Sequence, residues 1–481
     1  MRLSRRALAA VPEAARPRLG PAGLRTGLVH LGIGAFHRAH QAVYTEDAGD
    51  PAFGVCGVTM RSMAAAELLG PQDHLYSVLE RDGEHASIRV IGVLTEVVGP
   101  ETGIIRIADP AVRVITMTVT EPGYRHDPAT GRLRASDPEV AADLAGRPPL
   151  TAVGRLVAGL RARRAADAGP VTVMSCDNLV GGGRLLAGLV AEHCRLGREE
   201  DLLAWIGSNV AFPSSMVDRI VPAATAADRA AASRLLGVAD RAALATEPFR
   251  QWVIEDSFAA GRPPWEQAGA VVVGDVAPYE TMKLRLLNGV HSLLGHLGVL
   301  AGLGTVDEAV ARPDLAEVAR RYLEYDAAPT VGPPPGVDLA AYRVRLLSRL
   351  ANPALRHPLA QIAADGTHKL PQRLLPVIRA RLARGAEPRW AALGVAAWMR
   401  CVSAGHADDG APLPVTDPAA ERLRMPQAPP AQVVDRLLGL LGRDLPDSGE
   451  LRALLVDWLA RLAADGALAT VRAAVCEQPR P

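Results

Sequence analysis

The fold is decided by one stretch near the N-terminus, LVHLGIGAFH, which runs from Leu28 to His37. Its first four residues form a short apolar run typical of a buried strand, and Gly32-Ile33-Gly34 follow where a helix should begin. In a dinucleotide-binding α/β fold, two such glycines allow a tight turn and close approach of a pyrophosphate to the helix N-terminus. Because His37 replaces the usual third glycine, the motif alone is weak, and a plain strand-to-helix turn remains the alternative.

Further short apolar runs alternate with Ala- and Leu-rich helical segments. They are VCGVT from Val55, SIRVIGVL from Ser87, VRVITMTV from Val112 and VTVM from Val171. This alternation predicts a parallel sheet with helices on both faces. Beyond about Pro278 the β-type runs disappear and helical patterns continue. We therefore expect an α/β dinucleotide-binding domain over residues 1–277 and a mainly helical domain over residues 278–481.

Composition excludes several classes of protein. The chain has 481 residues, which suggests two or three compact units, and 49% of them are apolar, which excludes a mainly disordered chain. With 53 basic and 52 acidic side chains the net charge is only +1, so no strong overall field attracts nucleic acid or an anionic membrane. A small neutral or singly charged molecule is the expected partner.

Cysteines and apolar segments give no sign of secretion, metal binding or membrane insertion. The five cysteines are scattered without a CxxC pair, so neither a disulfide scaffold nor a thiolate zinc site is predicted. The basic opening is interrupted at Pro12 and Glu13, which is poor for a secretion signal, and polar residues interrupt the apolar stretch from Leu284 to Leu303. We expect a cytoplasmic protein.

The most informative segment is YETMKLRLLNGVH, from Tyr279 to His291. At about 100° per residue along an α-helix, with Lys283 at zero, Glu280 lies at about 60°, His291 at about 80° and Asn288 at about 140°. Polar groups among leucines cost free energy unless they find partners. The segment is either a partly exposed amphipathic helix or a polar wall of a cleft.

A cleft would give these side chains specific chemistry. Burial lowers the pKa of a lysine, so a neutral Lys283 amine could accept a proton. An amide such as Asn288 can stabilise a developing alkoxide, and His291 can hold a hydroxyl. These groups suit a secondary-alcohol dehydrogenase that uses no metal. A rival interpretation combines Tyr279 and Lys283 as the YxxxK pair of short-chain dehydrogenases, although the pair lies far later in the chain than that fold requires.

Six motifs together resemble the mannitol dehydrogenase family, the polyol-specific long-chain dehydrogenases. The motifs are HLGIGAFHRAHQ from His30, TVTEPGY from Thr118, SCDNL from Ser175, FPSSMVDRI from Phe212, ETMKLRLLNGVHS from Glu280 and DGTHKLPQR from Asp365. The resemblance implies a Rossmann-type N-terminal domain, a helical C-terminal domain and a metal-free site. It also implies NAD-linked interconversion of a C2 alcohol and a 2-ketose, as in mannitol 2-dehydrogenase and fructuronate reductase.

The resemblance also implies roles for individual residues. Lys283 would be the general base, Asn178 and Asn288 would stabilise the oxyanion, and His291 completes the K-x4-N-x2-H pattern. Glu280 would carry protons between the lysine and solvent. Asp218 would line the polyol site, with pairing to Arg219 or to another basic residue as its alternative. The alternative for Asn178 is capping of the helix that begins near Gly183.

The cofactor residues follow from the glycine motif and the resemblance. The expected set is Gly32, Ile33, Gly34, Ala35, Phe36, His37, Arg38, Arg61 and Glu121, the last of which could instead be an ordinary loop residue. NAD is the expected cofactor and NADP is possible, because the second strand ends in VTMRS without an acidic residue. Arg61 could bind a 2′-phosphate or be solvated.

Substrate choice depends on the helical domain. Lys369 and Arg373 lie in a segment that we expect to start a helix around Pro371, and a guanidinium matches a carboxylate well. A hexonate substrate is therefore favoured over a neutral hexitol, with a solvated basic helix start as the alternative. A non-catalytic nucleotide-binding regulator on the same fold is the other functional class. A monomer and a small homo-oligomer both remain open.

Overall fold

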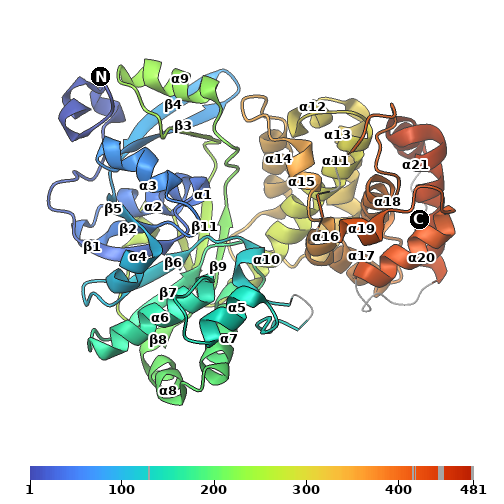
Figure 1. The fold of residues 1–481 in the computed structure, drawn as a ribbon. Helices are drawn as coiled ribbons and strands as arrows, with labels where there is room; N and C mark the ends of the chain where they lie inside the picture. Colours follow the sequence, from blue (N-terminus) through green and yellow to red (C-terminus); the bar gives the residue numbers. More distant parts are fainter. Residues whose placement is uncertain (128–129, 414–415, 418, 442–448, 478–481) are drawn as a thin grey trace. The chain divides into compact units, whose positions relative to one another are not determined.

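The computed structural model describes residues 1–127, 130–413, 416–417, 419–441 and 449–477. The chain divides into two compact units, Met1–Ala277 and Pro278–Pro481. The first combines sheets and helices and the second is helical (Figure 1), so the predicted fold class is confirmed.

The N-terminal unit is built on a six-stranded sheet in which all neighbouring strands are parallel. In spatial order its strands are β5 (Leu94–Val98), β2 (Gly54–Val58), β1 (Thr26–Leu31), β6 (Val114–Met117), β7 (Val171–Ser175) and β8 (Val210–Ala211). Numbered by their order within this sheet, the strands run 3-2-1-4-5-6, the order of the doubly wound dinucleotide-binding fold.

Both faces of this sheet are buried, because successive side chains of a strand point to opposite sides. In β1, Leu28 contributes to one hydrophobic core, while Val29 and Leu31 contribute to the core on the other face. The helices of this unit are α1 (Ala35–Ala39), α2 (Gln41–Asp47), α3 (Ala64–Leu69), α4 (Pro100–Ile107), α5 (Pro138–Leu144), α6 (Ala152–Ala165), α7 (Gly182–Leu196), α8 (Glu200–Asn209) and α9 (Ala226–Leu236).

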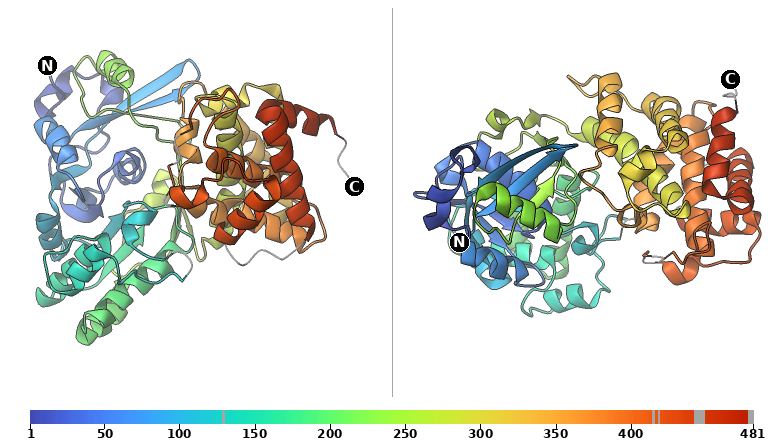
Figure 2. Two further views of the ribbon diagram at one scale, coloured as in Figure 1. Left: turned by 45° about the vertical axis from the view of Figure 1, so that its right-hand side comes forward. Right: turned by 90° about the horizontal axis from the view of Figure 1, so that it is seen from above.

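Two three-stranded sheets complete this unit. One contains β10 (Leu244–Thr246), β3 (Tyr76–Asp82) and β4 (His85–Ile91), and the other contains β12 (Val271–Val273), β11 (Gln251–Glu255) and β9 (Ser215–Asp218). The run SIRVIGVL, which we predicted to lie in the parallel sheet, is divided between β4 and β5. The part in β4 pairs antiparallel with β3, visible as two long blue strands in Figure 2. A short break at Ile91–Leu94 permits the change of sheet, and the apolar pattern does not reveal it.

The C-terminal unit is a helical bundle around α11 (Gly289–Leu300), whose side chains are almost all buried (Figures 1 and 2). Before α11 lie α10 (Ala277–Lys283) and a π-helical turn, η7 (Leu284–Asn288). The other helices are α12 (Val306–Val310), α13 (Pro313–Arg321), the π-helical η8 (Tyr322–Ala327), α14 (Leu339–Leu350), α15 (Leu359–Ala363), α16 (Gly366–Arg373), α17 (Leu375–Leu382), α18 (Arg389–Ala404), α19 (Ala420–Leu423), α20 (Pro430–Leu441) and α21 (Gly449–Cys476).

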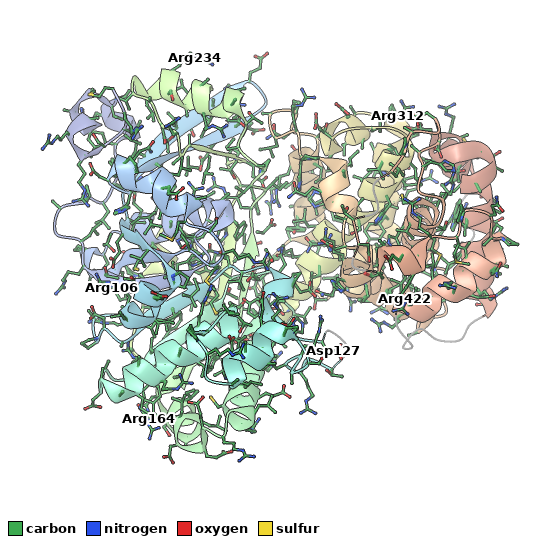
Figure 3. The ribbon with its side chains drawn as sticks, viewed as in Figure 1. Arg106, Asp127, Arg164, Arg234, Arg312 and Arg422 are labelled. Atoms are coloured by element: carbon green, nitrogen blue, oxygen red, sulfur yellow. The ribbon has the colours of Figure 1, made fainter. Side chains whose placement is uncertain are left out.

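The distribution of charged side chains and the state of the cysteines agree with the composition. Charged side chains are spread over both units, and the labelled arginines in Figure 3 lie at the outer edges. All five cysteines are free, and only Cys476, at the end of α21, is exposed. Within the described residues, no helix combines the length and the apolar character that crossing a lipid bilayer would require.

Candidate active site

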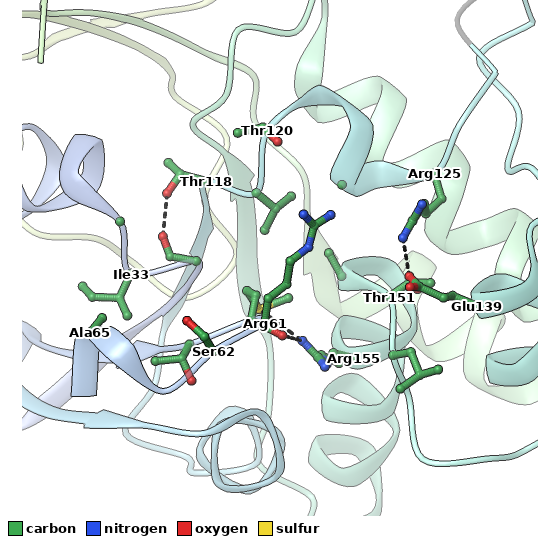
Figure 4. Close-up of a pocket in the computed structure, with 18 of the residues that line it drawn as sticks. Ile33, Arg61, Ser62, Ala65, Thr118, Thr120, Arg125, Glu139, Thr151 and Arg155 are labelled. Carbon is green, nitrogen blue, oxygen red and sulfur yellow. Dashed lines mark hydrogen bonds and ion pairs between the residues drawn. The ribbon is translucent and has the colours of Figure 1, made fainter. Parts of the chain in front are cut away.

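A pocket of about 440 Å³ opens at the carboxyl ends of the central strands of the N-terminal unit (Figure 4). Gly32, Thr59 and Thr118 line it, and they directly follow β1, β2 and β6. The strand order reverses between β1 and β6, and ligands of open α/β sheets bind at such switch points. The pocket therefore lies where a dinucleotide is expected.

The glycine turn forms one wall of this pocket. The N–H groups of Gly32 and Ile33 donate to the carbonyl of Val58 at 2.9 and 3.2 Å, which fixes the turn against β2. At Gly32, φ is +97° and a Cβ would lie 2.2 Å from the carbonyl oxygen of Thr118, so no other residue fits. At Gly34 a Cβ would meet no atom closer than 3.6 Å, which leaves that side of the backbone open for a pyrophosphate.

The opposite wall is held by a residue to which sequence reasoning gave no role. The carboxylate of Asp177 accepts hydrogen bonds from the backbone N–H groups of Val119 and Thr120 at 2.9 and 3.1 Å. It also accepts one from the hydroxyl of Tyr124 at 2.8 Å. Burial raises the pKa of this carboxyl, while its three donors act in the opposite direction. Asp177 thus ties the loop after β6 to the end of β7. Its place in SCDNL, beside Asn178, was the available signal.

Arginines dominate the charge of the pocket. Arg125 is paired with Glu139, and Arg155 donates to the carbonyl of Met60. Arg61 is exposed, reaches from the end of β2 into the pocket (Figure 4), and has no ion-pair partner among the described residues. The single carboxylate that lines the pocket, among the residues described, is therefore neutralised, and Arg61 is available to an anionic group.

The other predicted cofactor residues do not line this pocket. His37 is buried and stacks on His30 with ring centroids 3.4 Å apart, and burial lowers its pKa well below the ordinary value. Arg38 donates to the carbonyls of Gly34 and Ala242. Ala35 and Phe36 begin α1, and half-buried Glu121 begins a short 3-10 turn. Contact of these five residues with a cofactor stays a prediction.

Asn178 and Asp218 lie at the ends of strands that belong to different sheets of the N-terminal unit. Asn178 is exposed and follows β7, whereas Asp218 ends β9 and is buried. Helix α7 begins after Gly181, and the hydroxyl of Ser214 accepts a hydrogen bond from the N–H of Gly183 in its first turn, at 3.2 Å. The role of Asn178, in the oxyanion site or as a cap of this helix, stays a prediction. The neighbour of Asp218, Arg219, donates to Glu80 and to the carbonyls of Ala39 and Glu247.

The predicted catalytic residues of the C-terminal unit lie on one continuous helical segment. Lys283 ends α10, Asn288 ends the π-helical turn η7, and His291 lies in the first turn of α11. Glu280, Lys283, Asn288 and His291 are all buried, between 5% and 8% exposed. The alternative of a partly exposed amphipathic helix is therefore not what the structure shows.

The π-helical turn changes the predicted arrangement of these side chains. Its hydrogen bonds connect residue i to residue i+5, and its wider turn brings Asn288, five residues after Lys283, closer to the face of Lys283 than an α-helix would. The angle of about 140° that an α-helix would give between Lys283 and Asn288 is therefore too large. His291 follows Asn288 by three residues in α-helix and shares its face. The amine, the amide and the imidazole thus form one polar stripe.

The hydroxyl of Tyr279 makes a hydrogen bond to the backbone. Its hydroxyl donates to the carbonyl of Pro335 at 2.8 Å, and its side chain is 3% exposed. A tyrosine that protonates a carbonyl must present its hydroxyl to the substrate. This geometry gives the YxxxK interpretation no support.

The surroundings of His291 are strongly basic. Burial lowers its pKa well below the ordinary value, and the charges of His357, Arg373, Arg349 and Lys283 lower it further. The ring therefore stays neutral around pH 7, and its Nε2 is buried without a hydrogen-bond partner in the described part of the chain. An unpaired buried nitrogen is costly, and a substrate hydroxyl would satisfy it. Sequence analysis missed His357 and Arg349, which lie far from Lys283 along the chain.

Helix α16 carries the predicted substrate residues. It begins at Gly366, five residues before Pro371, because Asp417 accepts hydrogen bonds from the N–H and hydroxyl of Thr367 and fixes an earlier start. Our predicted start around Pro371 is therefore wrong. Arg373 is half-buried and donates to the hydroxyl of Ser292 at 3.1 Å, next to His291.

Lys369, one turn before Arg373 on α16, contacts the end of α15. Its ammonium donates to the carbonyls of Gln361 and Ile362 at 3.2 and 3.3 Å. Its charge also lowers the pKa of His357, after the larger effect of burial. Lys369 therefore adds to the positive charge around His291.

Comparisons with known proteins agree with this architecture. The family model described as the mannitol dehydrogenase Rossmann domain matches residues 26–267, and the model of the mannitol dehydrogenase C-terminal domain matches residues 275–462. The chain belongs to the mannitol dehydrogenase family. It is therefore an oxidoreductase with a dinucleotide-binding N-terminal domain, as the motifs predicted.

Named members of the mannitol dehydrogenase family match over most of the chain. D-mannonate oxidoreductase of Escherichia coli is 42% identical, over 91% of this chain and 93% of that protein. Mannitol 2-dehydrogenase of Pyrenophora tritici-repentis is 37% identical, over 98% and 86%. The ternary complex of Pseudomonas fluorescens mannitol 2-dehydrogenase with NAD and D-mannitol has a TM-score of 0.92 and 34% identity, over 99% and 100%.

Proposed function

We propose that this protein is a nicotinamide-dinucleotide-dependent 2-dehydrogenase that interconverts the C2 hydroxyl of a linear hexonate or hexitol and the corresponding 2-ketose. The proposal rests on the buried stripe of Lys283, Asn288 and His291 in a member of this family. NAD is the proposed cofactor, since a family member forms a complex with NAD and the glycine turn fits a dinucleotide.

One feature of the whole sequence supports the role of the lysine. Of the 53 Lys and Arg side chains, only Lys283 and Lys369 are lysines, and arginine is used everywhere else. A guanidinium stays protonated in proteins and cannot act as a base, whereas a buried amine can. The chain thus keeps an amine at the position where a proton must be accepted.

The proposed chemistry assigns each residue a separate task. Bound NAD would accept the hydride that leaves C2. Lys283 removes the proton from the C2 hydroxyl, and the amides of Asn288 and Asn178 donate hydrogen bonds to the oxygen as its charge develops. His291 accepts from a neighbouring hydroxyl through Nε2. Glu280, one turn before Lys283, passes the proton towards solvent.

The charges around the stripe favour an acidic substrate. Arg373 and Arg349 add positive charge near His291, and Lys369 adds positive charge near the adjacent ring of His357. A sugar carboxylate would be attracted by these groups, and a guanidinium can bind it with two parallel hydrogen bonds. We therefore propose a hexonate such as D-mannonate as the better substrate and mannitol as the weaker one.

An absorbance assay for the reduced nicotinamide tests the proposal directly. The purified protein is incubated with NAD or NADP and with mannitol, arabinitol, mannonate or altronate. We expect the fastest reduction of the dinucleotide with a hexonate and no reduction without a polyol. Dinucleotide binding without turnover of any of the four would contradict the proposal and favour a nucleotide-binding regulator.

The position of Arg61 leads to a prediction about the cofactor. In an Arg61→Glu variant, we expect the affinity for NADP to fall by at least about tenfold relative to NAD, because a carboxylate repels the 2′-phosphate and can accept from ribose hydroxyls. Binding is measured by titration of protein fluorescence with each dinucleotide. Arg241→Glu, an equal charge change at an exposed residue outside the pocket, is the control. An unchanged NADP-to-NAD ratio would show that Arg61 is simply solvated.

A further inference from the structure

The π-helical turn between Lys283 and Asn288 is held by a residue from another helix. A π-helical turn displaces backbone carbonyls from their ordinary α-helical partners, and a buried carbonyl without a donor is costly. The hydroxyl of Tyr322 donates to the carbonyl of Arg285, in the middle of η7, at 2.6 Å. Tyr322 is 0% exposed, so its side chain is enclosed where it contacts this carbonyl.

A glycine makes this contact possible. A Cβ at position 289 would lie 2.0 Å from the hydroxyl oxygen of Tyr322 and 2.9 Å from its ring carbon Cζ. Any other residue at Gly289 would push the tyrosine away from the turn. The hydroxyl of Tyr322 therefore occupies the space beside η7 that a side chain at position 289 would fill.

The tyrosine is itself firmly placed. Tyr322 begins the second π-helical turn of this unit, η8, which follows α13. In the same turn, the carboxyl of Asp326 accepts from the backbone N–H groups of Trp390 and Ala391, both at 2.7 Å, and so anchors η8 to the start of α18. Burial also raises the pKa of Tyr322 well above the ordinary value, which keeps its hydroxyl protonated and able to donate.

We propose that Tyr322 is a positioning residue, whose hydrogen bond to the carbonyl of Arg285 maintains the π-helical turn and so keeps the Lys283 amine in line with the Asn288 amide. If η7 relaxed to an α-helix, Asn288 would rotate away from the face of Lys283. The inference rests on the proposed function in one respect, since it takes Lys283 and Asn288 as the catalytic residues.

The test begins with a Tyr322→Phe variant, which removes only the hydroxyl. We expect kcat to fall roughly 10- to 100-fold with the dissociation constant of the dinucleotide unchanged, because a misplacement of about 1 Å can cost a factor of this size. Tyr279→Phe is the matched control. It removes a buried tyrosine hydroxyl that donates to a backbone carbonyl at 2.8 Å, but outside η7, and we expect less than about a threefold change.

A double-mutant cycle with Asn288→Ala separates positioning from general packing. If Tyr322 acts through the alignment of Asn288, Tyr322→Phe should cost less than about threefold once the amide is absent. Additive losses, or equal losses in Tyr322→Phe and Tyr279→Phe, would overturn the proposal. If Lys283→Ala kept its activity, the proposed function would fail instead, so the two failures can be told apart.

Amide hydrogen exchange gives a measure that is independent of turnover. In Tyr322→Phe, peptides that cover residues 284–290 should exchange faster, while peptides of the N-terminal unit keep their rates. In Tyr279→Phe, the same peptides should exchange as in the unmodified protein. Unchanged exchange over residues 284–290 in Tyr322→Phe would show that the hydroxyl does not hold the turn, and would overturn the proposal.

Discussion

Lys283→Ala is expected to lower kcat for oxidation of the preferred polyol by roughly 10³-fold or more, while dinucleotide affinity stays unchanged. Proton transfer by a positioned base contributes typically 10²- to 10⁴-fold. Water is a poor substitute in this buried stripe, because Lys283 is only 7% exposed. The loss should appear in kcat and kcat/KM alike, since the amine acts on the reacting hydroxyl.

The role of Lys283 as a base also predicts the direction in which each rate changes with pH. Oxidation needs the neutral amine, so its rate should rise with pH, whereas reduction of the ketose needs the protonated ammonium and should slow as pH rises. Titration of His291 does not contribute to these changes of rate near pH 7, because burial keeps its pKa well below the ordinary value. In Lys283→Ala the pH dependence of oxidation and that of reduction should both disappear.

Chemical rescue provides the control for Lys283→Ala. A small primary amine such as methylamine, added to the variant, should restore part of the rate, and a quaternary ammonium salt of equal concentration should not. Arg345→Ala, which changes an exposed cation on α14, should leave turnover unchanged. Turnover of Lys283→Ala within a few-fold of the unmodified protein would remove the lysine from the mechanism.

Arg373→Ala should change substrate preference more than it changes catalysis. We expect kcat/KM for mannonate to fall by about 10²-fold and that for mannitol by less than about fivefold, because losing a charge-assisted hydrogen bond leaves a carboxylate unpaired. Arg373 is placed for this role by its hydrogen bond to Ser292, next to His291. The measurement is a pair of steady-state titrations with the two substrates.

Two further variants refine the result for Arg373. Arg373→Lys keeps the charge and loses the planar fork, so its loss for mannonate should be intermediate. Arg345→Ala again serves as the control for loss of an exposed cation from the same unit. If mannonate and mannitol lost activity equally in Arg373→Ala, the guanidinium would have a structural role and the preference for a hexonate would need another source.

Local signals in the sequence predicted the fold because they act over short distances. The glycine turn after Leu31 and the alternating runs marked the parallel sheet correctly, since backbone approach at Gly32 and burial on both faces leave a pattern in neighbouring residues. The division of residues 87–98 between two sheets left no such pattern in the sequence. The two strands β4 and β5 are similarly apolar, and the strands that pair with them lie elsewhere in the chain.

Features of the site that depend on distant residues could not be predicted. The pattern from Glu280 to His291 indicated a polar face, but α-helical geometry misplaced Asn288, because the π-helical turn is held by Tyr322, 37 residues after Arg285. Arg349 and His357 reach the surroundings of His291 only through the packing of the bundle. The start of α16 depends on Asp417, which is 50 residues away from Thr367.

The distribution of thiols has a practical consequence for spectroscopy. Cys56, Cys176, Cys194 and Cys401 are enclosed in the folded protein, while Cys476 faces solvent at the end of α21. A maleimide dye should therefore attach to the native chain at one defined place, without any engineered substitution. The natural protein can therefore carry a single dye at a known position for single-molecule fluorescence.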